Sequence, residues 1–344
     1  MFILRIWAIV FLLFLLMPPL LTGVIIIKGT NEIIEKSVIT TQYAYIYILK
    51  HHIESFLTTV ADDLLFLAQS PPLQAYLALR NQEVSSTTSS ESVVLTIPHL
   101  EKTKQLRRVL AEEFLLFSRH RTIYDQVRYL DETGQEMVRI NVNKAVSKIV
   151  ADEDLQNKSD RYYFKETMPL SSEEIFVSPL DLNSEKGTLE RPLKPIIRYA
   201  TPVYYNKGRK AGIVVLNVNA DQFLHPLGRV RLIDSAGYFL NHPNSNNCWG
   251  GPNDLNTGYK FSQEYPQLAN QISAQAGVYE TDNQIVLLQP INVPQASYHW
   301  TLILPQDKNI IPQLITRFHL WLNVLSMSIG LVGLIWLLKF KRFR

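Results

Sequence analysis

The chain has 344 residues, of which 47% are apolar, and its formal net charge is +3. All 31 acidic residues lie between residues 28 and 318, whereas five of the 34 basic residues lie outside that part, which leaves it 29 basic residues and a slightly acidic balance. Because the excess of positive charge sits beside apolar stretches at the two ends, the composition argues against nucleic-acid binding.

Two apolar runs are each long enough to cross a membrane. Residues 6–27 are 22 positions without a charge, and residues 319–338 are another 20. At about 1.5 Å of rise per residue, either helix would cross a hydrocarbon core of about 30 Å. We therefore expect two transmembrane helices, which argues against a soluble cytoplasmic enzyme.

The basic tail KFKRFR at residues 339–344 predicts a cytoplasmic end, because positive charge favours the inner side. Residues 1–5 would share that side, and the bulk of the chain would be periplasmic, outside a bacterial inner membrane. No A-x-A-like cleavage site follows the first run, which favours an uncleaved anchor. A single cysteine, Cys248, excludes an intrachain disulfide and a Cys-based zinc site. We expect no metal and no cofactor.

Residues 28–75 are expected to form a long juxtamembrane helix that ends near Pro71 and Pro72. An apolar heptad stripe runs along it, at Ile46, Leu49, Ile53, Phe56 and Val60. Such a stripe is typical of a homodimer seam, but it also fits packing on the chain's own domain. The sequence leaves both interpretations open.

Further along the chain, a polar loop is expected at residues 81–92 and a second amphipathic helix at residues 106–117. The apolar period then changes to two. One hairpin is predicted where residues 137–142 alternate after the turn at 131–134, and a second where residues 195–203 and 212–218 flank Asn-Lys-Gly. A helix near residues 263–275 and strands at 285–288 and 299–304 complete the prediction.

An internal repeat suggests two similar modules. The octapeptides VRYLDETG at 127–134 and VRLIDSAG at 230–237 agree at four of eight positions, and each opens a strand-rich stretch. The predicted fold class is therefore α+β, with two small antiparallel modules on the long helix. We place a membrane-distal module at residues 76–222, a membrane-proximal module at 223–308 and a link to the second span at 309–318.

Three strings carry a family resemblance: VRYLDETGQEMVRIN, LQNKSDRYYFKET, and the stretch from FVSPLDLN to KPIIRYATPV and VVLNVN. Together they resemble the distal module of a double Cache sensor domain, as found in bacterial sensor histidine kinases, diguanylate cyclases and chemoreceptors. RLIDSAGYFLNHPN and YHWTLILP are similar to the proximal module. The resemblance implies a PAS-like fold for each module and ligand binding in the distal one.

Members of that family usually carry an output domain after the second span. Only six residues follow Leu338 in this sequence, and they contain no transmitter motif. The sequence leaves open whether the chain signals alone, signals through a separate cytoplasmic or membrane transmitter protein, or no longer signals. The other expected partners are a small-molecule ligand, the membrane and a second copy of the chain.

The segment DRYYF is the first candidate wall of the ligand site. A guanidinium is a planar fork of donors that suits a carboxylate, and tyrosines offer hydroxyls. The family resemblance implicates Arg161, Tyr162, Tyr163 and Phe164 by position. The alternative is that Arg161 pairs with an acid such as Asp160 while the aromatic rings are core.

The second candidate wall runs from Lys194 through Arg198 to Thr201. Lys194 and Arg198 share strand parity, so both cations would face one side of a sheet and need an anion there. Asp181, Glu185 or a ligand carboxylate would supply it. A solvated edge strand with ordinary surface charges is the alternative.

The sequence contains none of the common catalytic motifs, so no enzyme is expected. The interpretation that fits best is a sensor that binds a small polar molecule, with a carboxylate modestly favoured. The alternative is a membrane-anchored binding or accessory subunit that transmits no signal.

Overall fold

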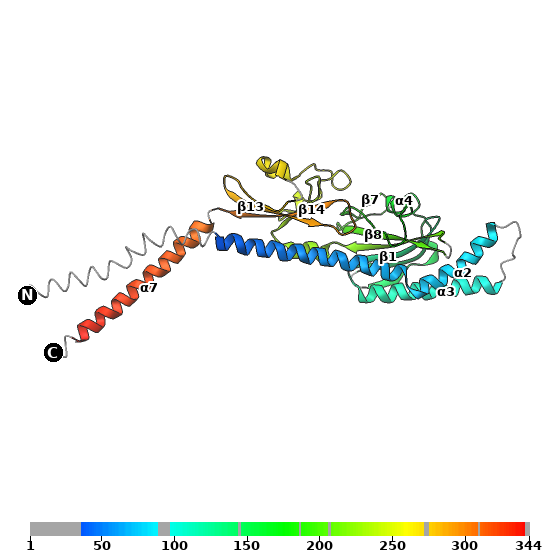
Figure 1. Cartoon of the computed structure of the whole chain (residues 1–344), viewed down its shortest axis with the longest axis horizontal. Coiled ribbons are helices and arrows are strands. Elements are labelled where there is room, and N and C mark those ends of the chain that lie inside the picture. Colours follow the sequence, from blue (N-terminus) through cyan, green and yellow to red (C-terminus); the bar gives the residue numbers. More distant parts are fainter. Residues whose placement is uncertain are drawn as a thin grey trace, which may run out of the picture. The chain divides into compact units, whose positions relative to one another are not determined.

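The structure is a computed structural model that describes residues 36–88, 97–143, 146–185, 187–205, 208–271, 275–308 and 310–340 (Figure 1). It is an α+β fold with antiparallel sheets and a long N-terminal helix, as predicted. The first expected span, residues 6–27, lies outside the described residues.

The N-terminal helix covers residues 36–68 and ends where prolines follow. A new helix, α2 (Pro71–Thr88), begins immediately, because proline is tolerated in a first turn, where its missing N–H costs nothing. The predicted loop at 81–92 was therefore wrong for residues 81–88, which continue α2. Helix α2 packs against α3 (Ile97–His120).

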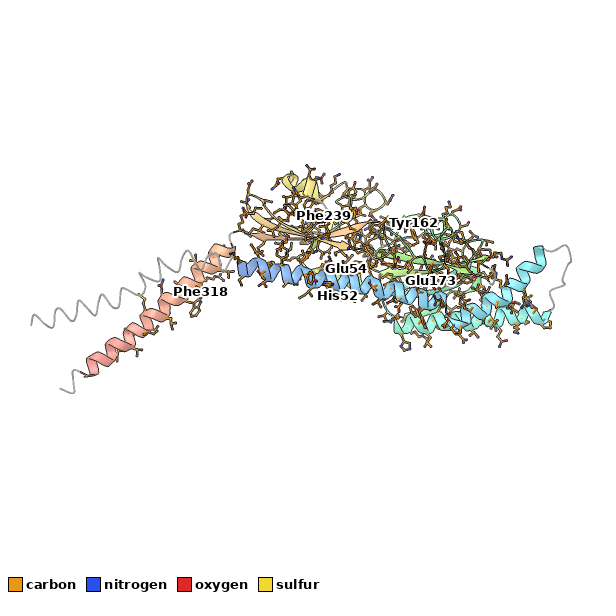
Figure 2. All side chains as sticks on the ribbon, in the orientation of Figure 1. His52, Glu54, Tyr162, Glu173, Phe239 and Phe318 are labelled. Carbon is orange, nitrogen blue, oxygen red and sulfur yellow. The ribbon has the colours of Figure 1, made fainter. Side chains whose placement is uncertain are left out.

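The heptad stripe of the N-terminal helix is covered by the chain itself. Ile53 and Val60 are fully buried, and the Phe56 ring lies 5.5 Å from the ring of Phe223. His52, on the neighbouring face, is exposed (Figure 2). Packing on the chain's own domain is thus observed, whereas the homodimer seam stays a prediction.

The first sheet is built from both predicted hairpins. β1 (Tyr124–Asp131) pairs with β2 (Glu136–Asn143), and β8 (Pro195–Tyr204) pairs with β9 (Lys210–Asn219), all antiparallel. The order is β3-β2-β1-β9-β8-β4, and β5 also pairs with β8. The smaller strands are β3 (Val146–Ile149), β4 (Phe176–Val177) and β5 (Asp181–Leu182), with β6 (Ser184–Glu185) and β7 (Thr188–Leu189) as a separate ribbon.

Short helices follow the strands. A 3-10 turn, η1 (Asp152–Asp154), precedes helix α4 (Tyr162–Thr167), whose residues Tyr163 and Phe164 pack on Leu130, Ala200, Ile213 and Val215 of the sheet. Helix α4 therefore covers part of one sheet face, and this positions the candidate site.

The second sheet has the order β11-β10-β14-β13-β12. Its strands are β10 (Arg231–Ile233), β11 (Phe239–Asn241), β12 (Gly277–Glu280), β13 (Gln284–Asn292) and β14 (His299–Asp307), and the last two contain the predicted strands. The single helix expected near 263–275 was wrong. Two short pieces replace it, α6 (Phe261–Glu264) and η4 (Pro266–Gln271), because a proline interrupts a helix that it does not begin. The remaining turns are α5 (Asp221–Leu224), η2 (His225–Leu227) and η3 (Ser245–Asn247).

The second expected span, residues 319–338, lies within helix α7 (Ile310–Phe340). Over the described part of the chain, no helix combines the length and hydropathy that a membrane crossing requires. Neither predicted span is confirmed.

The chain divides into two compact units. One comprises Leu49–Ala276 and Gln289–Ile303, and it contains the whole first sheet. The remaining described residues belong to the other unit. The module boundary expected between residues 222 and 223 stays a prediction.

Candidate functional site

Four strands of the first sheet place polar side chains on one face. Arg128 of β1 lies opposite Arg139 of β2, and Arg198 of β8 lies opposite Asn217 of β9. Gln126 of β1 pairs with the same Asn217 on its other side. Paired residues of neighbouring strands project to the same face, so the register brings these groups together.

Arg198 is the centre of one polar cluster. Its Nη1 donates to Asp181 Oδ1 at 2.8 Å and to the Tyr162 hydroxyl at 3.1 Å, and its Nη2 donates to Asn183 Oδ1 at 3.1 Å. The side chain is only 4% exposed. Burial disfavours the charged guanidinium, but Asp181 together with Tyr162 and Tyr163 outweighs it, so the pKa of Arg198 is raised and the side chain stays charged.

Arg128 is the centre of a second cluster. Its Nη2 donates to Asn217 Oδ1 at 2.6 Å and its Nη1 donates to the Tyr163 hydroxyl at 3.0 Å. Arg128 and Arg139 both lie 3.6 Å from the buried carboxylate of Glu136, so two guanidiniums share one acid. Within the described residues, Arg128 Nε and Glu136 Oε1 have no hydrogen-bond partner. This buried network is rich in donors.

A cavity of about 270 Å³ lies beside these clusters, near the small end of the range for ligand pockets. Lys194 lines it together with Glu190, to which its ammonium bonds at 2.5 Å. Burial raises the pKa of Asp125 in the same wall, although Lys194 opposes the shift. The full lining is Asp125, Gln126, Arg139, Asn141, Val142, Asn143, Asn183, Glu190, Lys194 and Ile196.

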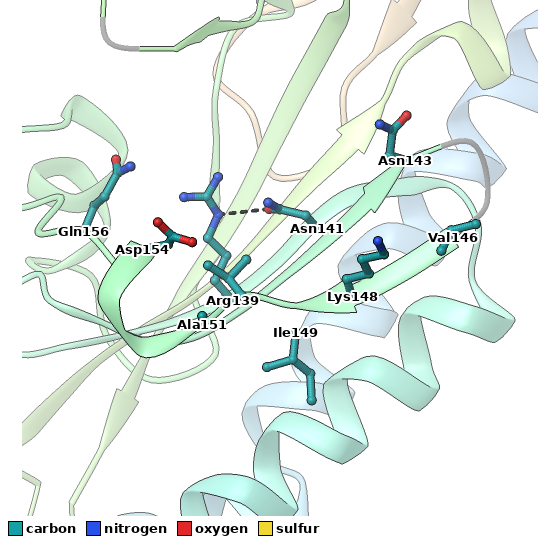
Figure 3. A pocket seen from close by; sticks show the side chains of 10 residues that line it. Arg139, Asn141, Asn143, Val146, Lys148, Ile149, Ala151, Asp154 and Gln156 are labelled. Atoms are coloured by element: carbon teal, nitrogen blue, oxygen red, sulfur yellow. Dashed lines mark hydrogen bonds between the residues drawn. The ribbon is translucent and has the colours of Figure 1, made fainter.

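A wider depression of about 800 Å³ adjoins it along β2 and β3 (Figure 3). Arg139 and Asn141 line both hollows, and Arg139 Nε donates to Asn141 Oδ1 at 2.9 Å. The two hollows therefore share a wall that presents donors and acceptors.

The structure brings some of the predicted site residues together. Tyr162, Asp181 and Arg198 are in mutual contact. Lys194 lines the cavity but bonds to Glu190. The two predicted cations, Lys194 and Arg198, are therefore each paired with a different acid. The side chain of Glu185 lies outside the described residues.

The other predicted residues differ in exposure. Arg161 immediately precedes α4, is partly exposed and forms no side-chain hydrogen bond or ion pair with the described residues. Tyr163 and Phe164 are buried in the sheet core, and Thr201 donates to the Glu174 carbonyl at 2.8 Å. All three residues are buried.

Sequence reasoning missed Arg128, Glu136, Arg139 and Asn217. The available signal was polar residues at alternate positions of otherwise apolar strands, as in Arg139 and Asn141 of β2. Such alternation is more often a solvated face, and only the structure shows that these four residues are buried. No group of His, Cys, Asp and Glu suited to a metal ion occurs in the described residues.

Comparison with known families decides the assignment. Residues 76–303 match the family model described as the bacterial histidine kinase sensor domain. The chain belongs to this family. The match is to a sensor domain and not to a catalytic domain, and it confirms the resemblance drawn from the sequence. No curated protein matched the chain.

Solved sensor domains share the fold. The extracellular domain of a candidate histidine kinase, vpHK1S-Z8, superimposes with a TM-score of 0.65 at 23% identity, over 84% of this chain and 96% of that one. A domain of a candidate sensory box/GGDEF family protein from Vibrio parahaemolyticus gives 0.64 at 23% identity, over 82% and 99%. The sensory domain of the Campylobacter jejuni chemoreceptor Tlp3 gives 0.50 at 15% identity, over 83% and 99%. At these identities the likeness concerns the fold alone.

Proposed function

We propose that this protein is a membrane-anchored extracytoplasmic sensor that binds a small polar ligand on the first sheet. The observation that carries the proposal is the buried face on which Arg128, Arg139 and Arg198 gather beside the 270 Å³ cavity. The family match supports a sensor role. Guanidiniums are the side chains best suited to planar anions, so a carboxylate is the favoured ligand chemistry.

Arg161 is proposed as the ligand's first contact, because its guanidinium has no partner among the described residues. Tyr162, Asp181, Lys194 and Arg198 would complete the polar wall. Tyr163, Phe164 and Thr201 would hold that wall in place, since each is buried.

The two apolar runs at residues 6–27 and 319–338 support a two-span anchor in a bacterial inner membrane, with the sensor region in the periplasm. Ligand binding would shift the balance between two arrangements of the helices that enter and leave the membrane. We further propose a homodimer and a transmitter protein that receives the signal.

The test begins with the full chain in detergent micelles and a thermal-shift screen of small carboxylates, amines and sugars. A ligand at 100 times its Kd should add about 2.7 kcal/mol to the free energy of unfolding. Calorimetry with a hit should then show binding weakened roughly 10- to 100-fold by Arg161→Ala, because a charge-assisted hydrogen bond is lost. Arg161→Lys should also lose affinity, since an ammonium lacks the bidentate fork.

Lys165→Ala is the matched control, because it removes an exposed positive charge from α4, the helix that Arg161 immediately precedes. An unchanged Kd in the Arg161→Ala variant would remove Arg161 from the site. A screen in which no small molecule shifts the melt would count against the ligand-binding role itself.

A further inference from the structure

The segment from Ser178 to Asn183 joins the candidate site to parts of the chain far away in sequence. On one side, Asp181 and Asn183 accept hydrogen bonds from Arg198. On the other side, the backbone of the segment bonds to Asp254 and Tyr298, which follow their partners by 72 and 120 positions. All of these residues lie in one compact unit.

Asp254 satisfies a buried backbone donor of this segment. Its Oδ1 accepts from the Leu182 N–H at 2.8 Å, and Leu182 is only 3% exposed. Successive N–H groups of a strand point to opposite sides, and the next one, of Asn183, donates to the Lys194 carbonyl beside β8. In the described sheet, β5 pairs with β8 alone, so the Leu182 N–H has no strand partner. A buried N–H needs an acceptor, and Asp254 supplies it.

The loop that carries Asp254 is itself compact. The Asp254 and Asn256 N–H groups both donate to the Gly251 carbonyl, and the Leu255 N–H donates to the Trp249 carbonyl. These bonds fix the carboxylate opposite Leu182. The loop is therefore a rigid support.

Tyr298 holds the other end of the segment. Its hydroxyl donates to the Ser178 carbonyl at 2.5 Å, and Ser178 is fully buried. Ser178 also exchanges two bonds of 2.9 Å with the Arg198 backbone, through its N–H and its hydroxyl. Burial raises the pKa of Tyr298 well above its ordinary value, so its hydroxyl remains a donor.

Neighbouring acids have other partners. Asp181 is paired with Arg198, and Asp234 accepts from the Ala236 and Tyr238 N–H groups of its own turn. Both carboxylates act on Asp254 only through their charge. Among these three acids, Asp254 alone bonds to the backbone of the segment.

We propose that Asp254 is a positioning residue of the distal binding site, with Tyr298 as a second anchor. By holding the Ser178–Asn183 segment, they set where Asp181 and Asn183 meet the Arg198 guanidinium. A ligand anion that displaces Asp181 from Arg198 would therefore bind beside a segment that the loop of Asp254 holds in place. The ligand role of the site rests on the proposed function, but the positioning of Arg198 does not require a ligand.

The test uses the unliganded full chain in detergent micelles and two readouts. Hydrogen exchange followed by mass spectrometry reports the Leu182 amide, and phenylglyoxal, a guanidinium reagent, reports the accessibility of Arg198. Asp254→Ala should speed exchange of that amide about tenfold, because one hydrogen bond is lost, and should raise the modification rate of Arg198 several-fold. Asp254→Asn should restore both values to near wild type, since its side-chain oxygen still accepts. Tyr298→Phe should raise Arg198 modification as well.

Two controls separate positioning from general damage. Asp234→Asn removes a neighbouring charge but no bond to the segment, and it should change neither readout. Modification of Arg128 should stay at the wild-type rate in every variant. The proposal is overturned if Asp254→Ala leaves Leu182 protected, if Asp254→Asn behaves like Asp254→Ala, or if Arg128 becomes as reactive as Arg198. Because no ligand is added, these two readouts test the positioning role of Asp254 separately from the proposed ligand binding. A failed ligand screen would therefore not contradict the positioning role.

Discussion

At the scale of single residues, Arg161 and Arg198 have opposite environments although both were predicted to line the site. Arg198 is buried and bonds to three side chains, whereas Arg161 is partly exposed and bonds to none among the described residues. A guanidinium that already has partners stabilises the unliganded fold. One without partners remains available for a ligand.

This contrast gives a stability prediction. Arg198→Ala should lower the free energy of unfolding by about 3 kcal/mol, because it leaves the Asp181 carboxylate without its cation in a largely buried place. Arg161→Ala should leave the free energy of unfolding unchanged. Denaturant melts of the two variants measure both values, and equal effects would show that the two environments do not differ.

Asp254 gives a pH prediction. Burial, with the nearby charges of Asp181 and Asp234, raises the pKa of Asp254 to about 6, although the bond from Leu182 opposes the shift. A raised folded pKa means that the folded state binds more protons than the unfolded chain. Stability is therefore lost as pH rises from the ordinary carboxyl range to about 6, and changes no further above it. Denaturant melts at several pH values should show that the free energy of unfolding of Asp254→Asn rises relative to that of wild type across that interval. If the two free energies change in parallel with pH, the raised pKa of Asp254 is wrong.

At the scale of elements, the N-terminal helix uses its apolar stripe to pack against other parts of the same chain. Ile53 is fully buried, and Glu54 of the same turn accepts from the Asn292 N–H at 3.2 Å. The helix therefore packs along its own unit through both apolar and polar contacts.

Ile53→Asp should accordingly destabilise the monomeric fold. The change removes a buried side chain and places a carboxylate in apolar surroundings, so a loss of at least about 3 kcal/mol is expected. His52→Asp, one position away on the exposed face, is the control and should have little effect. Thermal melts and size-exclusion profiles distinguish unfolding from a change in assembly, and a stable Ile53→Asp variant that only dissociates would favour an intermolecular seam.

At the scale of the whole molecule, the proposed two-span topology makes a direct prediction. Reporter fusions after Lys28 should report from the periplasm, and fusions at Arg344 should report from the cytoplasm, because the basic tail favours the inner side. Phosphatase and fluorescent reporters are active on opposite sides and so check each other. A periplasmic signal from the Arg344 fusion would overturn the proposed topology.

The sequence alone was sufficient for the α+β class, both hairpins of the first sheet and the sensor family. These features follow from local signals: a period of two, turn residues between strands, and short strings such as SPLDLN. Local signals failed at residues 81–88, which continue α2 although their Ser and Thr residues have weak helix propensity.

Tertiary structure alone decided which polar residues form the candidate site. The residues around the Arg128 cluster come from strands nearly 90 positions apart, and Arg128 reaches Asn217 only through the β1–β9 register. In the sequence, Arg139 and Asn141 alternate with apolar residues, and such alternation records that a strand has two faces but not which of them is covered. The partner of each charge depends on that covering, to which α4 contributes by packing on the sheet face.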